Sequence, residues 1–208
     1  MAPDPGGWYG RRNATDGARV VISAVVLAAG AATRFGATKQ LRAVRGKPLA
    51  QHAVDAASPV VDEVLVVLGH DADAVEASLA LPPGGRAVRN PRFADGQSTS
   101  LAAGLRACTA GSQAAVVLLA DQPGIGDRHV RALVEAFWAT GAPILRIRFR
   151  DAPGPALLAR SVWREAERLT GDVGARALFD ADPERVRWVP VDEDAPPDVD
   201  VPEDLDRA

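Results

Sequence analysis

Residues 20–39 read VVISAVVLAAGAATRFGATK and decide how the rest of the chain is interpreted. The first seven residues carry no charge and are rich in β-branched side chains, which predicts a short buried strand. The loop that follows contains Gly30 and Gly36, small residues between them, and the two cations Arg34 and Lys39. Small residues let the backbone approach a ligand, and exposed N–H groups bind phosphate. The segment predicts a phosphate-binding loop, with a plain glycine-bearing turn as the alternative.

Two well-known phosphate-binding patterns do not match this loop. A P-loop requires G-x-x-x-x-G-K-[ST], but five residues separate Gly30 from Gly36, and Ala37 follows. A dinucleotide-binding fold requires G-x-G-x-x-G after the strand, and that pattern is missing from the sequence here. The loop is therefore of another kind.

Apolar runs alternate with segments of helical spacing along the whole chain. The expected strands are 20–26, 63–69, 86–88, 114–120, 143–149, 156–158 and 185–191. The expected helices are 47–57, 71–79, 98–108 (with Ser98 as N-cap), 128–139, 161–169, 173–179 and 202–207. This alternation predicts an α/β fold: a three-layer, Rossmann-like, mostly parallel sheet with helices on both faces. Ligands of such sheets bind at the carboxyl ends of the strands.

Length and composition indicate one globular domain over residues 20–208, preceded by a Gly- and Pro-rich disordered extension over 1–19. The net charge of −3 argues against nucleic acid as a partner. No segment has the apolar length of a membrane span, so no membrane partner is expected. The single cysteine, Cys108, lies in an apolar-periodic segment, is expected to be buried, and fits a cytoplasmic location.

Two aspartates are candidates for a metal site. Asp121 follows the apolar run 114–120 directly, at the expected ligand-binding edge of the sheet. Asp200 lies just before the segment 202–207. Mg²⁺ takes one or two protein carboxylates together with water and phosphate oxygens. The alternatives are a turn aspartate at 121 and a helix N-terminal charge at 200.

The loop has the pattern L-A-A-G-x-x-x-R-x-G-x-x-K, which resembles the signature of the nucleotidyltransferases related to molybdenum cofactor biosynthesis. The resemblance implies a fold of the nucleotide-diphospho-sugar transferase type and a loop that wraps a nucleoside triphosphate. It assigns phosphate contacts to Gly30, Arg34 and Lys39, with Arg34, Lys39 and Asp121 as catalytic residues. The nucleotide would also contact Leu27, Ala28 and Ala29, with the two alanines beside the base and ribose.

Three further segments resemble motifs of the same family. The segment 90–101 is similar to N-P-x-x-x-x-G-x-x-x-S-L, which makes Asn90, Gly96 and Ser100 nucleotide or acceptor contacts. DVDVPED (198–204) resembles the closing D-x-D-T-P-E-D motif and makes Asp200 the second metal ligand beside Asp121. GDVGAR (171–176) places Arg176 on the acceptor side, where a solvated helix arginine is the alternative. The family's G-H-P motif retains Pro155 here but lacks its histidine.

The resemblance implies a Mg²⁺-dependent enzyme that transfers a nucleoside monophosphate from an NTP to a phosphorylated acceptor and releases pyrophosphate. The Leu-Ala-Ala-Gly form resembles the CTP-using branch, whose acceptor is molybdopterin. A molybdoenzyme or its chaperone is then a candidate protein partner. The alternatives are GTP or another phosphorylated acceptor, an oxidoreductase of the same fold, and a non-catalytic protein that delivers cofactor.

Overall fold

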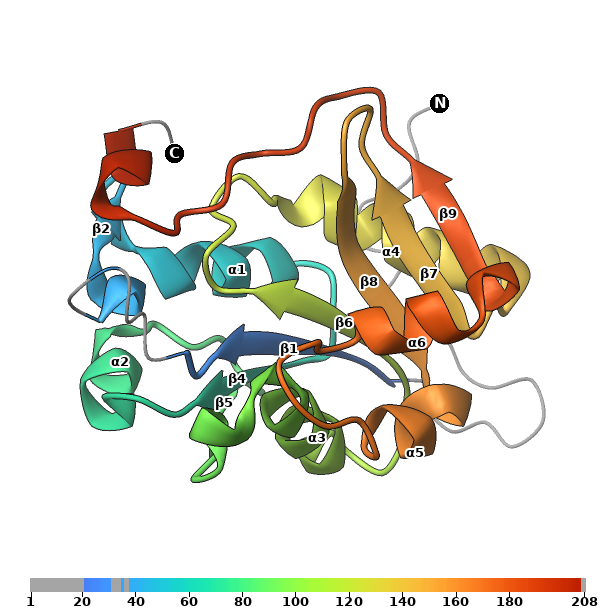
Figure 1. Ribbon diagram of the computed structural model, residues 1–208, viewed down its shortest axis with the longest axis horizontal. Coiled ribbons are helices and arrows are strands. Elements are labelled where there is room, and N and C mark those ends of the chain that lie inside the picture. Colours follow the sequence, from blue (N-terminus) through green and yellow to red (C-terminus); the bar gives the residue numbers. More distant parts are fainter. Residues whose placement is uncertain (1–20, 31–34, 36–37, 207–208) are drawn as a thin grey trace.

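A seven-stranded sheet forms the centre of the protein, in the order β5-β4-β1-β6-β8-β7-β9 (Figure 1). The computed structural model describes residues 21–30, 35 and 38–206. The expected extension 1–19 and Arg34 lie outside these residues. The strands are β1 (Val21–Ala28), β4 (Glu63–Leu68), β5 (Arg86–Arg89), β6 (Ser112–Leu119), β7 (Ile144–Arg148), β8 (Pro153–Ala159) and β9 (Val186–Pro190). Only β8 runs against its neighbours in this sheet, which confirms the mostly parallel arrangement.

Helices cover both faces of the sheet, as the alternating pattern predicts (Figure 1). One face packs against α1 and α4, and the other against α3, α5 and α6. The helices are α1 (Leu49–Ala57), α2 (Ala72–Ser78), α3 (Gln97–Ala107), α4 (Asp127–Thr140), α5 (Trp163–Ala166) and α6 (Arg176–Ala181). No helix in the described ranges is both long and apolar enough to cross a membrane.

Strand β1 is uncharged, and apart from Ser23 it is apolar, because it is buried on both sides. Ala24 and Val26 belong to the core on the α1 and α4 face, whereas Val25 and Leu27 belong to the core on the opposite face. A strand that pairs with a parallel neighbour on each edge and is covered on both faces has no position at which a charge can reach water. This burial places the carboxyl end of β1, and the loop after it, at a fixed point of the molecule.

Several expected boundaries are wrong. The expected helix 47–57 starts only at Leu49, because Ala43–Val44 (β2) and Lys47–Pro48 (β3) form a small antiparallel hairpin. Its turn residues, Arg45 and Gly46, both have positive φ, as this type of tight hairpin turn requires.

Later in the chain the helical segments are shorter than expected. In place of the expected helix 161–169, the structure has a 3-10 turn (Arg160–Val162) followed by the short helix α5. In place of the expected helix 173–179, it has α6, which begins only at Arg176. The last element, Pro202–Asp206, is a 3-10 helix. Proline at its first position is compatible with either helix type, so the sequence signal did not separate the two.

The N-terminus of α3 is capped by a distant loop and not by Ser98, which corrects the expected cap. Gly96 is the N-cap residue, with φ of 114°, and the Ser98 side chain is fully buried inside the first turn. The Gln97 N–H donates to Asp172 Oδ1 at 3.1 Å, and the Ser98 N–H donates to the Gly171 carbonyl at 3.2 Å. One carboxylate and one backbone carbonyl from the loop after α5 therefore accept hydrogen bonds that a local side chain usually accepts.

Candidate functional site

A cavity of about 340 Å³ opens at the carboxyl ends of β1 and β6, the edge at which α/β sheets bind ligands. It is lined by Leu27, Ala29, Gly30, Lys39, Gln40, Phe93, Gln97, Ser100, Leu119, Ala120, Asp121, Asp172 and Asp200. Seven of the residues singled out from the sequence meet here: Leu27, Ala29, Gly30, Lys39, Ser100, Asp121 and Asp200. Their convergence from five separate segments defines the candidate site.

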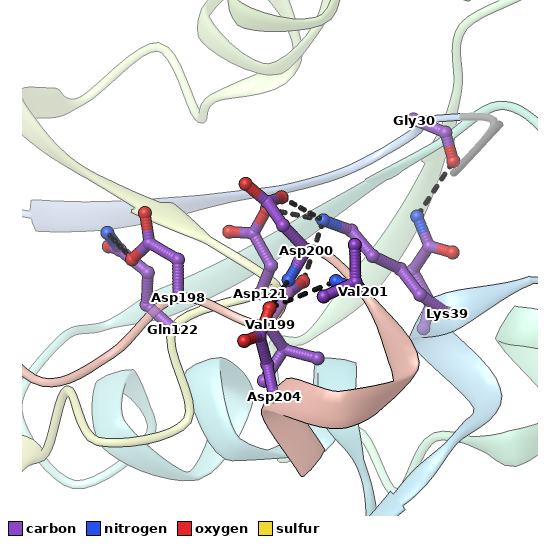
Figure 2. Close-up of polar contacts among 10 residues, drawn as sticks. Gly30, Lys39, Asp121, Gln122, Asp198, Val199, Asp200, Val201 and Asp204 are labelled. Atoms are coloured by element: carbon purple, nitrogen blue, oxygen red, sulfur yellow. Dashed lines mark hydrogen bonds and ion pairs between the residues drawn. The ribbon is translucent and has the colours of Figure 1, made fainter. Parts of the chain in front are cut away.

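Lys39 lies at the centre of this site (Figure 2). It begins the 3-10 turn Lys39–Leu41, and its side chain is only 14% exposed. The Nζ atom donates to Asp121 Oδ2 at 2.8 Å, to Asp200 Oδ1 at 3.3 Å and to the Val199 carbonyl at 3.1 Å. One ammonium group therefore holds together two carboxylates that would otherwise repel each other.

Asp121 carries an oxygen atom that is buried but has no hydrogen-bond partner in the described part of the chain, Oδ1. The residue lies two positions after the end of β6, and its backbone carbonyl accepts the Val199 N–H at 2.9 Å, which fixes its position. Leaving a buried carboxylate oxygen unpaired is costly unless another group completes its environment.

The donors around Lys39 fit a divalent cation. Hard cations prefer carboxylate oxygens, and Mg²⁺ usually takes one or two of them from the protein, leaving further positions to water and phosphate. Asp121 and Asp200 supply two carboxylates next to each other, one with a free buried oxygen. No cluster of three or more His, Cys, Asp or Glu side chains suited to a metal occurs among the described residues. A metal ion at this site would therefore take part of its coordination from water and phosphate, in addition to the described protein side chains.

Asp200 reaches the cavity on a segment we call the C-terminal strap, residues 191–201, which connects β9 to the last 3-10 turn (Figure 1, red). Val199 anchors the strap: it is fully buried in a small core with Phe35, Val44 and Leu49. The Asp204 carboxylate then accepts the N–H groups of Asp200 and Val201 at 2.9 and 3.0 Å. These contacts fix the backbone on both sides of the Asp200 carboxylate.

A third carboxylate, Asp198, adds to the negative charge. Its Oδ1 accepts a hydrogen bond from Gln122 Nε2 at 2.8 Å (Figure 2). Burial raises the pKa of Asp198, and the neighbouring carboxylates of Asp121 and Asp200 raise it further. The site therefore concentrates more negative charge than Lys39 alone neutralises, which favours an additional cation.

Three of the expected contact residues lie beside the cavity and do not line it. Ala28 is buried within β1 on the opposite face. Asn90 donates to Thr99 Oγ1 at 2.9 Å and to Ser100 Oγ at 3.0 Å, so it orients the serine that faces the cavity. Gly96 packs against Gly171, where a Cβ atom would approach the backbone to 2.4 Å. Asn90 and Gly96 thus hold the wall of the site in place.

Six lining residues were not among the candidates expected from the sequence: Gln40, Phe93, Gln97, Leu119, Ala120 and Asp172. Gln40 donates to the Gly30 carbonyl at 2.9 Å, and its buried Oε1 has no partner in the described ranges. Gln40 directly follows the motif lysine, and Asp172 lies within the G-D-V-G-A-R segment. Their positions in or next to these motifs could have identified them as lining residues. Cys108 is buried as expected, and burial raises the pKa of its thiol to about 12, which rules it out as a nucleophile at neutral pH.

Residues 24–186 match the family model of the MobA-like NTP transferase domain. The structure of Rv0371c from Mycobacterium tuberculosis H37Rv superposes with a TM-score of 0.80 and 31% identity, covering 90% of this chain and 97% of that one. A structure of the same protein in complex with manganese superposes with a TM-score of 0.76. A nucleotidyl transferase from Methanothermobacter thermautotroptrophicus (Mth528) gives a TM-score of 0.67 and 25% identity over 82% of this chain and 87% of that one.

Bifunctional GlmU proteins also match. The protein from Bordetella petrii is 28% identical over 153 residues, which are 72% of this chain and 33% of that protein. The protein from Brevibacillus brevis is 54% identical over 61 residues, 28% of this chain and 13% of that protein. The chain thus spans a third or less of these curated relatives. The family model covers most of the described fold and the strands that form the cavity, so the chain belongs to the MobA-like NTP transferase family.

Proposed function

We propose that this protein transfers the nucleoside monophosphate of CTP to a phosphorylated acceptor, molybdopterin in the first instance, and releases pyrophosphate. One observation carries the proposal: the Lys39 ammonium group bridges Asp121 and Asp200 beside a buried, unpartnered carboxylate oxygen. This arrangement lies at the strand edge where nucleotides bind in α/β sheets. It provides both a cation for phosphate and oxygens for a metal in one cavity.

The nucleotide would lie along the carboxyl end of β1. No atom of the described residues lies within 4 Å of the point where a side chain at Gly30 would project, so phosphate oxygens could approach the backbone there. Lys39 would then supply positive charge to the triphosphate, together with Arg34 from the loop outside the described residues. Leu27 and Ala29 line the same wall. The small side chain of Ala29 in the Leu-Ala-Ala-Gly motif supports CTP over GTP, because that motif resembles the CTP-using branch.

A divalent cation, Mg²⁺ or Mn²⁺, would be held by Asp121 and Asp200. When bound, such an ion neutralises phosphate oxygens and orients the α-phosphate for attack. The manganese complex of Rv0371c supports a divalent cation in the family, and the unpartnered Asp121 Oδ1 supports it in this chain.

In the proposed reaction, an oxygen of the acceptor phosphate forms a bond to the α-phosphorus of CTP. The bond from that phosphorus to the bridging oxygen of the β-phosphate breaks, and pyrophosphate leaves with the electron pair. The described part of the chain offers no activated thiol or hydroxyl for a covalent intermediate, so the protein would act by positioning and charge stabilisation. Lys39 and Arg34 would stabilise the negative charge on the departing pyrophosphate.

Pyrophosphate release tests the proposal directly. Wild-type protein is incubated with Mg²⁺, molybdopterin and either CTP or GTP, and pyrophosphate is measured with a coupled assay. We expect release that is faster with CTP. Replacement of the metal ligand, Asp121→Asn, should lower turnover by at least about a hundredfold while leaving the fold intact, since the side-chain shape is kept.

Asp192→Asn serves as the control, because that carboxylate is almost fully exposed and lies outside the cavity. Release with a different phosphorylated acceptor would move the assignment to that acceptor. No release with any NTP and acceptor, or full activity of the Asp121→Asn protein, would overturn the proposal.

A further inference from the structure

A second, smaller cavity adjoins the first. Its volume is about 150 Å³, and it shares Leu27, Gln97 and Leu119 with the larger cavity. Gln122, the neighbour of Asp121, also lines it. A molecule in the second cavity would therefore lie next to a nucleotide in the first, as a second reactant must. Its volume is close to that of a protein cavity that accommodates a benzene ring, so it suits a group of about one ring.

Arg146, in the middle of β7, faces this second cavity as a partly buried cation without a carboxylate partner. Its Nε–H donates to the Gly154 carbonyl at 3.3 Å, and no ion pair to it is found among the described residues. Burial lowers the pKa of the Arg146 guanidinium, and the positive charge of Arg176 lowers it further, whereas Asp180 acts in the opposite direction. An arginine remains charged despite such a shift, so the cavity wall carries a positive charge that Asp180 offsets in part but that forms no ion pair among the described residues.

Two aromatic rings stabilise the positive charge of Arg146, but they do not accept hydrogen bonds from its N–H groups. The guanidinium carbon lies 4.6 Å from the centre of the Phe179 ring and 5.7 Å from that of Trp188. Contacts of this type stabilise a cation through the face of the ring. The N–H groups at the edge of the guanidinium plane still need acceptors, and in the described structure only the Gly154 carbonyl provides one.

A second arginine lines the same cavity. Arg176 begins α6, and its Nε–H donates to Asp180 Oδ2 at 3.3 Å, which leaves its terminal amino groups exposed. The neighbouring strand β8 contributes a backbone carbonyl and no charge. Gly154 stands directly before Pro155, at the position of the histidine in the family's G-H-P motif. A Cβ atom at Gly154 would lie 2.5 Å from the Phe149 ring. A larger residue does not fit there, so the positive charge on this side of the cleft comes from β7 and α6.

We propose that Arg146 and Arg176 bind an anionic group of the second substrate, a small molecule in which a phosphate or carboxylate is joined to an apolar body of about one ring. The inference rests on the proposed function for the identity of this ligand as the acceptor. The anion would take the unused guanidinium donors, and the apolar body would contact Leu119, Ala156 and Phe179, which line the same space. The two arginines would then act as specificity determinants for the acceptor.

Binding of model anions tests the site. Phenyl phosphate and benzoate are titrated calorimetrically into wild-type protein, with phenol as the uncharged probe and with or without CTP and Mg²⁺. We expect the anions to bind in both conditions and phenol to bind much more weakly. Arg146→Met should reduce anion affinity at least about tenfold, since it removes hydrogen bonds between charged groups. Arg146→Lys should retain part of the affinity, because it keeps the charge without the fork of donors.

Arg148→Met is the matched control. Arg148 also lies over Trp188, at 4.3 Å from the ring centre, but it does not line the cavity. It should bind the anions as the wild type does. Thermal unfolding verifies that each variant is folded, and Arg176→Met provides a second test if Arg146→Met does not fold.

Equal anion affinity in Arg146→Met and wild type, equal losses in Arg146→Met and Arg148→Met, or displacement of the anions by CTP would overturn the inference. Failure of the proposed reaction has a different signature. In that case anion binding would still depend on Arg146, but no pyrophosphate would be released from any NTP.

Discussion

Lys39 occupies the position between two carboxylates that a divalent cation would also require. An ammonium group and a metal ion compete for the same oxygens of Asp121 and Asp200. Under the proposed function the lysine would have two successive roles: it pairs with both carboxylates in the unliganded protein, and it would move toward phosphate when a cation binds with the nucleotide. A residue of this kind links the charge balance of the unliganded protein to substrate binding.

Lys39→Met separates these roles. We expect the protein without ligand to lose about 1 kcal/mol of unfolding free energy. The loss is modest because the side chains of the two ion pairs are partly exposed to solvent. We expect Mn²⁺ to bind several-fold more tightly than in the wild type, since the competing ammonium group is gone. Nucleotide turnover should nevertheless fall strongly. Calorimetric Mn²⁺ titration and pyrophosphate release measure these effects.

Lys47→Met is the control for this substitution, because Lys47 pairs with Asp55 at an exposed position remote from the cavity. It should leave both readouts unchanged. Unaltered or weaker Mn²⁺ binding by Lys39→Met would show that the ammonium group does not compete with the metal.

At the scale of the elements, α3 supplies one wall of the site, and its first turn is held by a distant loop. Gln97 and Ser100 face the cavity, and the N–H groups at the start of the helix are satisfied by Gly171 and Asp172. The close approach of Gly96 to Gly171 makes this contact. The 171–172 loop thus supports the wall of the larger cavity, which Asp172 itself lines, although the loop lies far along the chain.

Gly96→Ala should disrupt this contact. The new methyl group would meet the Gly171 backbone at 2.4 Å, at a φ that L-residues rarely adopt. We expect a loss of about 2–4 kcal/mol in unfolding free energy and weaker CTP binding, measured by urea titration and thermal shift. Gly141→Ala is the matched control: it has positive φ but open space around it, so it should cost about 1 kcal/mol and spare CTP binding. Similar effects of both variants on CTP binding would contradict the assigned role of the contact.

The sequence predicted those elements whose signal is local. Strands β1, β4 and β6 consist mainly of apolar residues. The helices between them have clear helical spacing, so the three-layer fold could be predicted. The direction of β8 has no local signal, because pairing partners determine it. The β2–β3 hairpin was missed because it is short and contains charges. The cap of α3 by Asp172, and the lack of a carboxylate partner for Arg146 in the described part of the chain, depend on tertiary contacts that no local pattern encodes. Asp121, Asp200 and Lys39 were recognised through motifs and meet in space.

For the molecule as a whole, the C-terminal strap carries Asp198 and Asp200 back across the sheet to the site (Figure 1). Glu193 ties the strap to the start of α4: its carboxylate pairs with Arg128 at 2.8 Å and with His129 Nε2 at 2.5 Å. The Gly126 N–H donates to His129 Nδ1 at 3.0 Å, so a neutral His129 carries its proton on Nε2 and donates to Glu193. Near its other end, Val199 anchors the strap in the small core.

Glu193→Gln should loosen the strap and make the protein less sensitive to acid. Hydrogen bonds from Arg128, and then from His129, lower the pKa of Glu193. The native state therefore gains stability above the unfolded-state pKa, and loses it as the pH falls through the native pKa. We expect the substitution to cost less than about 1 kcal/mol at neutral pH, because the group is partly exposed. Mn²⁺ affinity should fall several-fold through displacement of Asp200.

Urea unfolding measures the free energy of unfolding at neutral pH and at pH of about 3, where carboxylates are largely protonated. The loss of unfolding free energy between the two pH values should be smaller for Glu193→Gln than for wild type. Asp192→Asn, next to it in the strap, should behave as wild type. An unchanged Mn²⁺ affinity would mean that Val199 alone positions Asp200.

The strap also sets the order in which the site is completed during biosynthesis. Lys39 and Asp121 are both synthesised before the strap, and Asp200 is synthesised 161 residues after Lys39. Domains begin to fold while translation continues. A nascent chain can thus form the central strands and most of the cavity without Asp200, and it gains the second of the two carboxylates beside Lys39 only when the strap has been synthesised and docked. A chain whose translation stops early would contain the loop after β1 but would lack the proposed second metal ligand.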